Sequence, residues 1–514
     1  MFPTRTLLKL LAVLEEELDA NQFTVGNLHL WPALRFLLAT KLQDNDQSKP
    51  RTAGVVDAEA EIERRFEALI QKSPSRADVS VDALRQAIPK GPVGQSSRVL
   101  VFVRADDHNL KTARGYYAPV TDPWAELLTG RWPYVKAEFP NSLSATTQPR
   151  HVMTLHVPGV GHDRHKPEDL AQCAAMLQVG RVFSVQVIKW LAVNFGIGLP
   201  ELTEVLENQL TSLWLQKMVY RSFIQSVQPG LVLVTCYYFP PSIGMVWAAR
   251  ELGVPVADIQ HGGNGAYHIG YTHWRHLPPG GYQLLPDYFF VWDNLSANNI
   301  LRWQPPGATA NQPLLTGRFG LDYGRRAAVG DGLPPALGQV IQGGEKTILV
   351  TLQTLASTGL SPLLLEAMRT APPTWTWLVR GHPIAQAWCN KDLMPDALNA
   401  ALKAAGVARY ETQLTTTLPL AALLPHVNHH VTGFSGTVQE CAAYGVRTTF
   451  THPTVWSFFG NYIEMGAADF AATAEELVAS IAANKQFPDL SAVLFVPRED
   501  NVALGVLSQI LKAT

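Results

Sequence analysis

The chain has 514 residues, of which 47% are hydrophobic and 16% are charged, a balance typical of folded globular domains and not of disordered chains. This length exceeds what one compact core supports, so we expect two domains of α/β size. The formal net charge of −2 supplies no positive field for nucleic acid, and the four cysteines lack the spacing of a zinc site or a disulfide framework. We therefore expect a reduced, cytoplasmic setting and no nucleic-acid partner.

The N-terminal segment carries an apolar run over residues 1–14, which Lys9 and the acidic residues 15–17 interrupt. No small-residue cleavage site follows, so we predict an amphipathic helix and not a signal peptide. No apolar run reaches the ~18 residues that a membrane span needs. We predict no membrane-spanning helix, while peripheral attachment at the inner membrane stays open.

A strand followed by a helix is predicted over residues 28–36, because Pro32 suits the first turn of a helix. The polar stretch 43–51 is predicted to be a linker. It contains Asp44-Asn45-Asp46, which has the pattern of a metal-binding DxD motif, but its Gln/Asn/Ser/Lys surroundings lack the rigid strand end that such a site needs. We predict no metal site in this chain.

Residues 98–104 form a Val-rich apolar run between two arginines, which predicts a strand covered on both faces. The loop that follows should face a cleft between domains. It holds one candidate nucleophile or base, Asp107, and a second one, Asp122, precedes a proline. Tyr116, Tyr117 and Trp124 are candidate acceptor contacts, although Asp-Pro is also ordinary turn chemistry.

Apolar residues recur at helical spacing over residues 199–227, which predicts a core helix. A strand (231–236), a helix (242–252) and a second strand (254–259) then predict a βαβ unit. Gln260-His261-Gly262-Gly263 falls at the carboxyl end of the second strand, where ligands bind in open α/β sheets. His261 or Asp258 could act there as a base or nucleophile, and Gln260 could contact the acceptor.

The second half alternates strand and helix with little ambiguity, which requires a parallel sheet with right-handed crossovers. Strands are predicted at 347–353, 374–380, 409–410, 429–432 and 447–450, and helices at 361–370, 393–405, 418–424, 437–444 and 474–483. The domain prediction is an N-terminal helical and strand segment (1–52), an acceptor-side Rossmann-like domain (53–321), a Gly/Pro/Arg-rich linker (322–345) and a nucleotide-sugar-binding Rossmann-like domain (346–514).

Two polar motifs follow strands of this second domain. Arg380-Gly381-His382-Pro383 offers an imidazole and a guanidinium to a phosphate, although His382 could also be a structural histidine. The other motif runs from Thr432 to Glu440 and supplies the Ser435 and Thr437 hydroxyls and the Gly436 backbone at the start of a helix, a common anion site. Glu440 would accept from ribose hydroxyls, or it only caps the helix.

Arg318 and Gln353 lie at an interdomain position and a strand end, so they are candidates for the phosphate and the base of a nucleotide. No GxxxxGK[ST] motif occurs, which excludes P-loop chemistry, and no GxSxG elbow occurs either.

At these motifs the chain resembles the GT-B glycosyltransferases of bacterial surface polysaccharide synthesis. The strand-end His-Pro followed by a Ser/Thr-rich turn is similar to the donor motifs of bacterial sialyltransferases and of the β-Kdo transferases of capsule and O-antigen (lipopolysaccharide) synthesis, which use CMP-linked sugars. The resemblance implies two Rossmann-like domains whose parallel sheets face a cleft. It also implies a metal-independent reaction without a cofactor, with the phosphate held by His382, Ser435 and Thr437 and the ribose by Glu440.

The resemblance leaves the base unassigned, because the acidic base motif of the sialyltransferases has no clear counterpart at Asp106-Asp107. A retaining enzyme would need a first-domain carboxylate as nucleophile, whereas an inverting one could use His261. We expect transfer of Kdo or a related 2-keto acid from a CMP donor onto a glycan or lipid-linked oligosaccharide. Transfer from a UDP-sugar, transfer of polyol phosphate from a CDP donor, and a non-catalytic scaffold are the alternatives.

Overall fold

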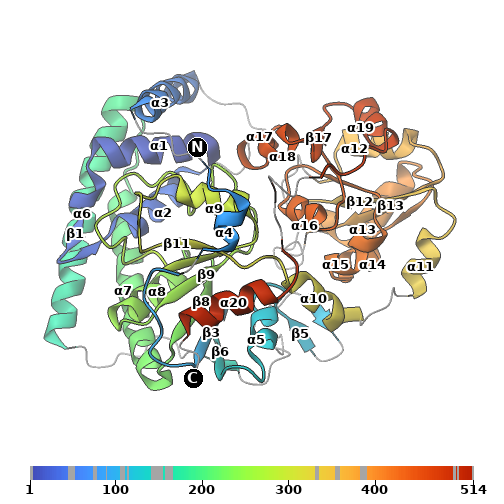
Figure 1. The fold of residues 1–514 in the computed structure, drawn as a ribbon. Coiled ribbons are helices and arrows are strands. Elements are labelled where there is room, and N and C mark those ends of the chain that lie inside the picture. Colours follow the sequence, from blue (N-terminus) through green and yellow to red (C-terminus); the bar gives the residue numbers. More distant parts are fainter. Residues whose placement is uncertain are drawn as a thin grey trace.

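The computed structural model describes residues 4–43, 53–72, 78–87, 89–104, 110–112, 115–139, 154–156, 166–329, 335–353, 359–382, 391–489, 494 and 497–511. They form two lobes that lie side by side (Figure 1). Each lobe is built on one large sheet in which every strand pair is parallel. The predicted fold class, two Rossmann-like domains in the GT-B arrangement, is confirmed.

The first sheet has seven strands in the order β11-β10-β9-β8-β3-β6-β7. These are β3 (Val99–Arg104), β6 (Tyr134–Phe139), β7 (Thr154–His156), β8 (Leu231–Thr235), β9 (Val256–Ile259), β10 (Tyr288–Val291) and β11 (Gln312–Leu315). The chain extends the sheet one way from β3 and the other way from β8. The strand order therefore reverses between β3 and β8, which is the place where open α/β sheets bind ligands.

The second sheet has six strands in the order β14-β13-β12-β15-β16-β17. These are β12 (Lys346–Thr351), β13 (Trp375–Arg380), β14 (Tyr410–Glu411), β15 (His429–Thr432), β16 (Thr448–Phe450) and β17 (Ala468–Phe470). Here the order reverses between β12 and β15. The strands predicted from 347 to 450 are all present, and β17 is an addition.

Side-chain alternation explains why both sheets are covered on two faces. In β3, Leu100 and Phe102 pack into one hydrophobic cluster, while Val99 and Val101 pack into another. In β12, Ile348 belongs to one cluster and Leu349 to the cluster on the other side. Successive strand residues point to opposite faces, so a continuous apolar run can bury both.

Helices cover both faces of each sheet (Figure 1). The first lobe contains α1 (Thr4–Glu17), α2 (Trp31–Leu42), α3 (Ala53–Gln71), α4 (Val81–Arg85), α5 (Asp122–Leu128), α6 (Pro167–Phe195), α7 (Leu202–Val227), α8 (Pro240–Glu251) and α9 (Asn294–Leu301), with the small antiparallel pairs β1 (Thr24–Val25) with β2 (Leu28–His29) and β4 (Leu110–Thr112) with β5 (Gly115–Tyr117). The second lobe contains α12 (Pro362–Thr370), α13 (Pro395–Ala404), α14 (Gln413–Thr417), α15 (Leu420–Leu423), α16 (Thr437–Ala443), α17 (Val455–Phe458), α18 (Gly460–Glu464) and α19 (Ala474–Ala482).

The predicted linker between the lobes is largely helical. It contains most of α10 (Gly320–Val329) and all of α11 (Pro335–Ile341). Glycine and proline suggested irregular chain there, but Pro335 stands at the first position of α11, where proline breaks no helical hydrogen bond. Gly324 and Gly338 lie inside the two helices, which tolerate single glycines.

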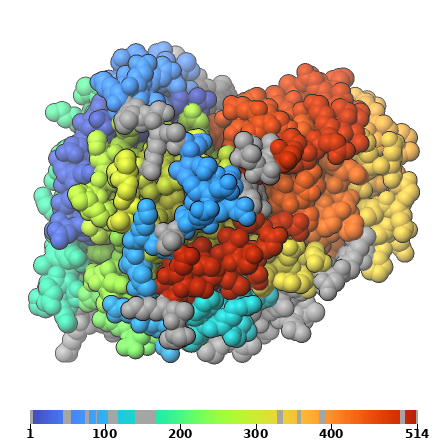
Figure 2. All heavy atoms as spheres, in the orientation of Figure 1, coloured from blue at the N-terminus to red at the C-terminus, as the bar shows by residue number. Residues whose placement is uncertain are grey.

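The last helix, α20 (Asn501–Ile510), returns to the first lobe. Its Val506, Leu507 and Ile510 pack on the face of the first sheet that α5 also covers, and Figure 2 shows it lying across that lobe. The returning chain is bonded to the outgoing one, because Arg318 N donates to Pro497 O at 2.7 Å and the Tyr323 hydroxyl donates to Asp500 at 2.8 Å. Two adjacent connections therefore link the lobes, an arrangement that the sequence did not reveal.

Within the described part of the chain, α6 is the helix whose length and composition could cross a membrane. It is also a packing helix, since Met176, Phe183, Val187 and Leu191 are buried in the core of the first lobe.

Candidate functional site

The carboxyl ends of the two sheets meet between the lobes. Residues that directly follow β9, β10 and β11 of the first sheet contact residues that follow β15 and β16 of the second. A Cβ placed on Gly263 would lie 2.4 Å from the Phe459 ring, and one on Gly265 would lie 2.3 Å from Phe458 O. Because there is little room for a side chain at these two glycines, the Gly263-Asn264-Gly265 segment allows the close approach of the other lobe.

The loop after β15 is fixed over the strand-order reversal of the second sheet. Thr351 of β12 is in register with Thr432 of β15, whose hydroxyl donates to Thr351 O at 2.8 Å. One step beyond, the Gln353 side-chain oxygen accepts from Phe434 N at 2.8 Å. Gln353 thus holds the first turn of the loop, and its predicted strand-end position is correct.

The two hydroxyls of this loop lie together. Ser435 Oγ and Thr437 Oγ1 are 3.0 Å apart, and Ser435 Oγ also accepts from Thr437 N at 3.3 Å. Both residues are partly exposed, and a Cβ on Gly436 between them would lie 3.2 Å from Gly263 N of the first lobe. The hydroxyl pair therefore lies where the lobes meet, as the sequence predicted.

Arg318 and Glu440, predicted separately as donor contacts, form an ion pair across the lobes. Arg318 Nη2 donates to Glu440 Oε1 at 2.5 Å, and the guanidinium carbon lies 3.6 Å from the centre of the Trp292 ring. The side chains are 12% and 16% exposed. Burial lowers the pKa of Arg318, and the Glu440 charge opposes that shift.

A second polar contact joins the same helical turn to the first lobe. Gln439 Nε2 donates to Asp293 Oδ2 at 2.7 Å, and Asp293 also caps α9 by accepting from Ser296 N. Burial raises the pKa of Asp293, which opposes its ionisation. The sequence analysis did not select Trp292, which the Arg318 guanidinium contacts, or Asp293, which Gln439 bonds. Trp292 and Asp293 follow β10 directly, so the strand-end rule that selected His261 would have found them.

The Arg380 motif is only partly directed at this site. Arg380 Nη1 donates to Thr415 O and, at 2.6 Å, to Leu418 O, and burial lowers the pKa of the guanidinium to about 10. This side chain holds α14 (Gln413–Thr417) and its C-cap residue against the sheet. Both bonds use the same guanidinium nitrogen, so a phosphate contact by the rest of the guanidinium stays a prediction.

His382 lies two residues beyond β13, on the other side of β12 from the Ser435 loop. Thr351 is in register with both Arg380 and Thr432, so the two motifs leave the sheet at one level, separated by two strand spacings of roughly 4.8 Å each. Burial and then the Arg380 charge lower the pKa of His382. The lowered pKa favours the neutral imidazole, which carries one N–H group. Pro383 lies outside the described residues.

The strand-end residues Asp258 and Gln260 of the first lobe are internal tethers. Asp258 is 1% exposed and accepts from the Tyr271 hydroxyl at 2.6 Å and from Tyr237 N at 3.0 Å. Burial raises the pKa of Asp258 to about 7. Gln260 is 1% exposed and bonds Trp292 N at 2.8 Å and the Ser296 hydroxyl at 3.1 Å. In this conformation neither side chain is open to contact by an acceptor sugar.

His261 differs from these two neighbours, since it is partly exposed. Its Nε2 lies 3.2 Å from the Tyr238 hydroxyl. It directly precedes the glycines that touch the second lobe. Tyr238 was not selected from the sequence, although it follows β8 at the reversal of strand order in the first sheet.

The remaining candidates of the first lobe are interior residues or lie outside the described part. Asp122 and Lys136 are both 0% exposed and form an ion pair of 2.5 Å. Trp124 stacks on Phe290 with ring centres 5.1 Å apart, and Tyr117 is fully buried. The expected acceptor and nucleophile roles of these three residues do not fit such positions. Asp107 and the Tyr116 side chain are outside the described residues.

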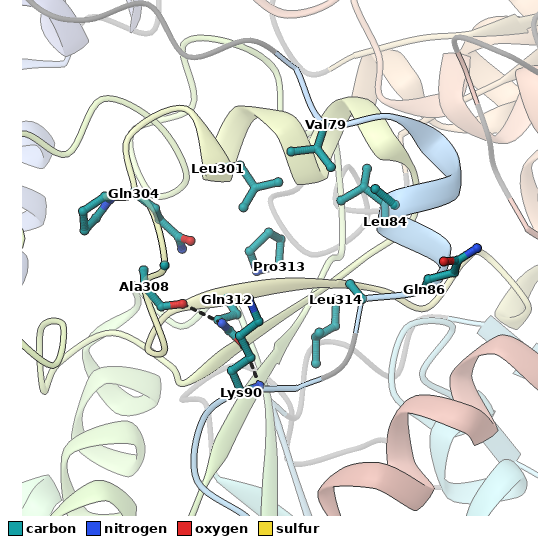
Figure 3. Close-up of a pocket in the computed structure, with 14 residues that line it drawn as sticks. Val79, Leu84, Gln86, Lys90, Leu301, Gln304, Ala308, Gln312, Pro313 and Leu314 are labelled. Atoms are coloured by element: carbon teal, nitrogen blue, oxygen red, sulfur yellow. Dashed lines mark hydrogen bonds between the residues drawn. The ribbon is translucent and has the colours of Figure 1, made fainter.

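A pocket of about 410 Å³ lies away from these residues, between α4 and the edge strand β11 (Figure 3). Val79, Leu84 and Leu301 line it together with β11. The Gln312 side chain crosses its floor, accepting from Lys90 N at 2.9 Å and donating to Ala308 O at 2.8 Å. Among the described residues that line it, Lys90 is the titratable one, and none carries a carboxylate or an imidazole.

No family model and no curated protein matches the chain. Among solved structures, the UDP-GlcNAc 2-epimerase of Neisseria meningitidis bound to UDP-GlcNAc is 14% identical with a TM-score of 0.46, over 81% of this chain and 100% of that chain. The UDP-GlcNAc 2-epimerase of Methanocaldococcus jannaschii is 10% identical with a TM-score of 0.43, over 80% and 99%. A spinosyn rhamnosyltransferase is 17% identical with a TM-score of 0.40, over 80% and 96%. These likenesses are weak, and the fold rests on the strand orders of the two sheets.

Proposed function

We propose that this protein is a glycosyltransferase that binds a nucleotide sugar between its lobes. One observation carries the proposal: the Ser435 and Thr437 hydroxyls and the Glu440 carboxylate lie together at the strand-order reversal of the second sheet, facing the carboxyl ends of the first. Ligands of open α/β sheets bind at such reversals. Nothing in the fold alone dictates the reaction, so the proposal rests on this site.

The nucleotide would bind to the second lobe. Ser435 and Thr437 donate their hydroxyls to the phosphate, and neutral His382 adds an N–H donor from the neighbouring strand end. Glu440 accepts from the ribose hydroxyls after giving up Arg318, which is then available to the phosphate. Gln353 would contact the base through its amide. A cofactor and a metal ion have no part in this proposal.

The acceptor would bind to the first lobe, and its hydroxyl would attack the anomeric carbon as the bond to the nucleotide phosphate breaks. Of the first-lobe candidates whose side chains are described, His261 is the partly exposed one. We propose it as the base that takes the acceptor proton, which implies inversion at the anomeric carbon. Asp258 and Asp122 are buried and bonded, so they do not serve as nucleophiles in this proposal.

For the donor we propose CMP-linked Kdo or a CMP-linked related 2-keto acid. For the acceptor we propose a glycan or lipid-linked oligosaccharide of bacterial surface-polysaccharide synthesis, with transfer taking place in the cytoplasm. These finer assignments rest on the resemblance of the His-Pro and Ser/Thr-rich motifs. A UDP-sugar or a CDP-polyol would use the same phosphate contacts and is the alternative donor.

Calorimetric titration tests the proposal directly. CMP, CDP, UDP and GDP, followed by CMP-Kdo, are titrated into the full chain. Binding of CMP in preference to the others supports the proposed donor, and binding of UDP alone would replace that donor while keeping the site. If none of these nucleotides or their sugars binds, the glycosyltransferase proposal is discarded.

A further inference from the structure

The outer face of α6 is apolar although it is open to solvent. This helix lies along the edge of the first lobe that is farthest from the second lobe (Figure 1). Of the nine large apolar side chains that are exposed in the described part of the chain, four belong to α6: Leu170 at 50%, Val182 at 42%, Val185 at 62% and Val193 at 75%. The solvent side of a helix in a globular domain is normally polar, so apolar residues gathered there indicate a contact surface.

The exposed residues of α6 recur at the spacing of paired helices. From Ala171 onwards, one exposed residue follows another at alternating steps of four and three positions. These seam residues are Ala171, Ala175, Gln178, Val182, Val185, Lys189 and Ala192, and all seven are exposed. Steps of four and three average 3.5 residues, the repeat that keeps one stripe of a helix facing a partner helix. The seam runs along most of this helix of 29 residues.

The seam is complementary to itself when a second copy runs in the opposite direction. In an antiparallel pair with a two-fold axis midway along the seam, the residues that face each other are Val182 and Val185, Ala175 and Ala192, and Gln178 and Lys189. Apolar residues then meet apolar residues of the same size. The Gln178 side-chain oxygen can accept from the Lys189 ammonium of the other copy, so no like charges are opposed. Such self-complementarity is what an isologous dimer requires.

The composition of the seam favours a second helix over a bilayer. Helices that lie on membranes carry Trp, Phe or Leu on the apolar face, whereas the apolar seam residues are alanines and valines. Short side chains let two helix axes come close together. We infer that two copies of this chain form a homodimer through antiparallel pairing of α6. The candidate site between the lobes is not covered by this pairing, and the inference does not depend on the proposed function.

Sedimentation velocity of the full chain, at concentrations from about 1 to 100 μM, tests the dimer. One helix pair is a small interface, so we expect the wild type to dissociate in the micromolar range. Val182→Glu places a carboxylate of each copy in the seam and should weaken association at least about a hundredfold. Val56→Glu on α3, where the valine is 52% exposed, is the matched control and should leave association unchanged.

Gln178 tests the direction of the pairing. In the antiparallel dimer, Gln178→Glu faces Lys189 of the other copy and should tighten association about fivefold, since the two-fold axis creates the ion pair twice. Gln178→Lys places two ammonium groups opposite each other and should weaken association by a similar factor. In a parallel pair Gln178 would face its own counterpart, so both charged variants should weaken association.

The homodimer is overturned if the wild type stays monomeric at the highest concentration, or if Val182→Glu associates as the wild type does. Weaker association in both Gln178 variants overturns the antiparallel pairing. Thermal unfolding of dilute Val182→Glu, expected to match dilute wild type because the position is exposed, shows that the variant is folded. A monomeric wild type that sediments with phosphatidylglycerol vesicles, when Val182→Glu does not, would assign the seam to a bilayer instead.

Discussion

At the carboxyl edge of the second sheet, Ser435 and Thr437 are partly exposed and hydrogen-bonded to each other. At the matching edge of the first sheet, Asp258 and Gln260 are 1% exposed and bonded to the chain around them. Both sets are polar residues at the ends of parallel strands. The difference lies in their neighbours, since tyrosines and backbone N–H groups around β9 bond its polar side chains, whereas Ser435 and Thr437 bond each other. A polar strand end is therefore a ligand site only where the fold leaves its polar atoms exposed.

The largest effect expected from this contrast concerns the buried ion pair of the first lobe. Asp122→Ala would leave the Lys136 ammonium buried without its carboxylate, and we expect a loss of about 3–5 kcal/mol of unfolding free energy. Urea unfolding measures it. Adding Lys136→Met should recover part of the loss, because the unpaired charge is removed. A variant that keeps its stability but loses transfer would instead make Asp122 a nucleophile, and the contrast would fail.

The pH dependence of stability sharpens the same contrast at Asp258. Its folded pKa of about 7 lies above the usual aspartate value of 3.8, so the folded state binds the proton more tightly than the unfolded state between those values. Stability should therefore fall as pH rises from about 4 to 7. Asp258→Asn lacks this titration, so the wild-type unfolding free energy should drop relative to the variant by up to about 1.4 kcal/mol per pH unit. Parallel curves for the two proteins would show that Asp258 does not titrate in this range.

In the second lobe, removal of the proposed phosphate contact at His382 should weaken donor binding without changing the free energy of unfolding. His382→Ala should cost about 2 kcal/mol, or roughly thirtyfold in the dissociation constant of the nucleotide that binds best. Because burial holds the pKa of His382 below its usual value, acidification should protonate it and strengthen wild-type binding, but not that of the variant. His426→Ala, at an exposed histidine of the same lobe, is the control. If wild type, His382→Ala and His426→Ala bind the nucleotide with equal affinity, His382 has a structural role only.

The smallest expected effect concerns the tether under the hydroxyl loop. Gln353→Ala removes the acceptor of the Phe434 N–H, and we expect about 1 kcal/mol, or a fewfold weaker nucleotide binding, through a less ordered loop. The exposed Gln342 offers a matched Gln→Ala control. If calorimetry finds that Gln342→Ala loses as much nucleotide affinity as Gln353→Ala, the Gln353 hydrogen bond does not support nucleotide binding.

The sequence predicted the parallel sheets because their strands are continuous apolar runs, such as residues 98–104 and 374–380, whose type does not depend on distant contacts. It also located the loop after β15, since glycines and hydroxyls mark a strand-to-helix turn. The sequence could not show that Arg380 bonds the carbonyls of Thr415 and Leu418, because a guanidinium after a strand has the same pattern whether it binds a ligand or a loop. Nor could it pair Arg318 with Glu440, which are 122 positions apart.

The two chain connections between the lobes limit how the lobes can move. Arg318 is bonded to Pro497, and Asp322 to Arg498 at 3.2 Å, so the outgoing and returning segments are fastened to each other. A single flexible connection would let one lobe twist and slide relative to the other. Two hydrogen-bonded connections resist twisting and sliding and favour rotation of the lobes about one hinge axis. We therefore expect the lobes to separate most on the side opposite these two connections, and substrate to enter there.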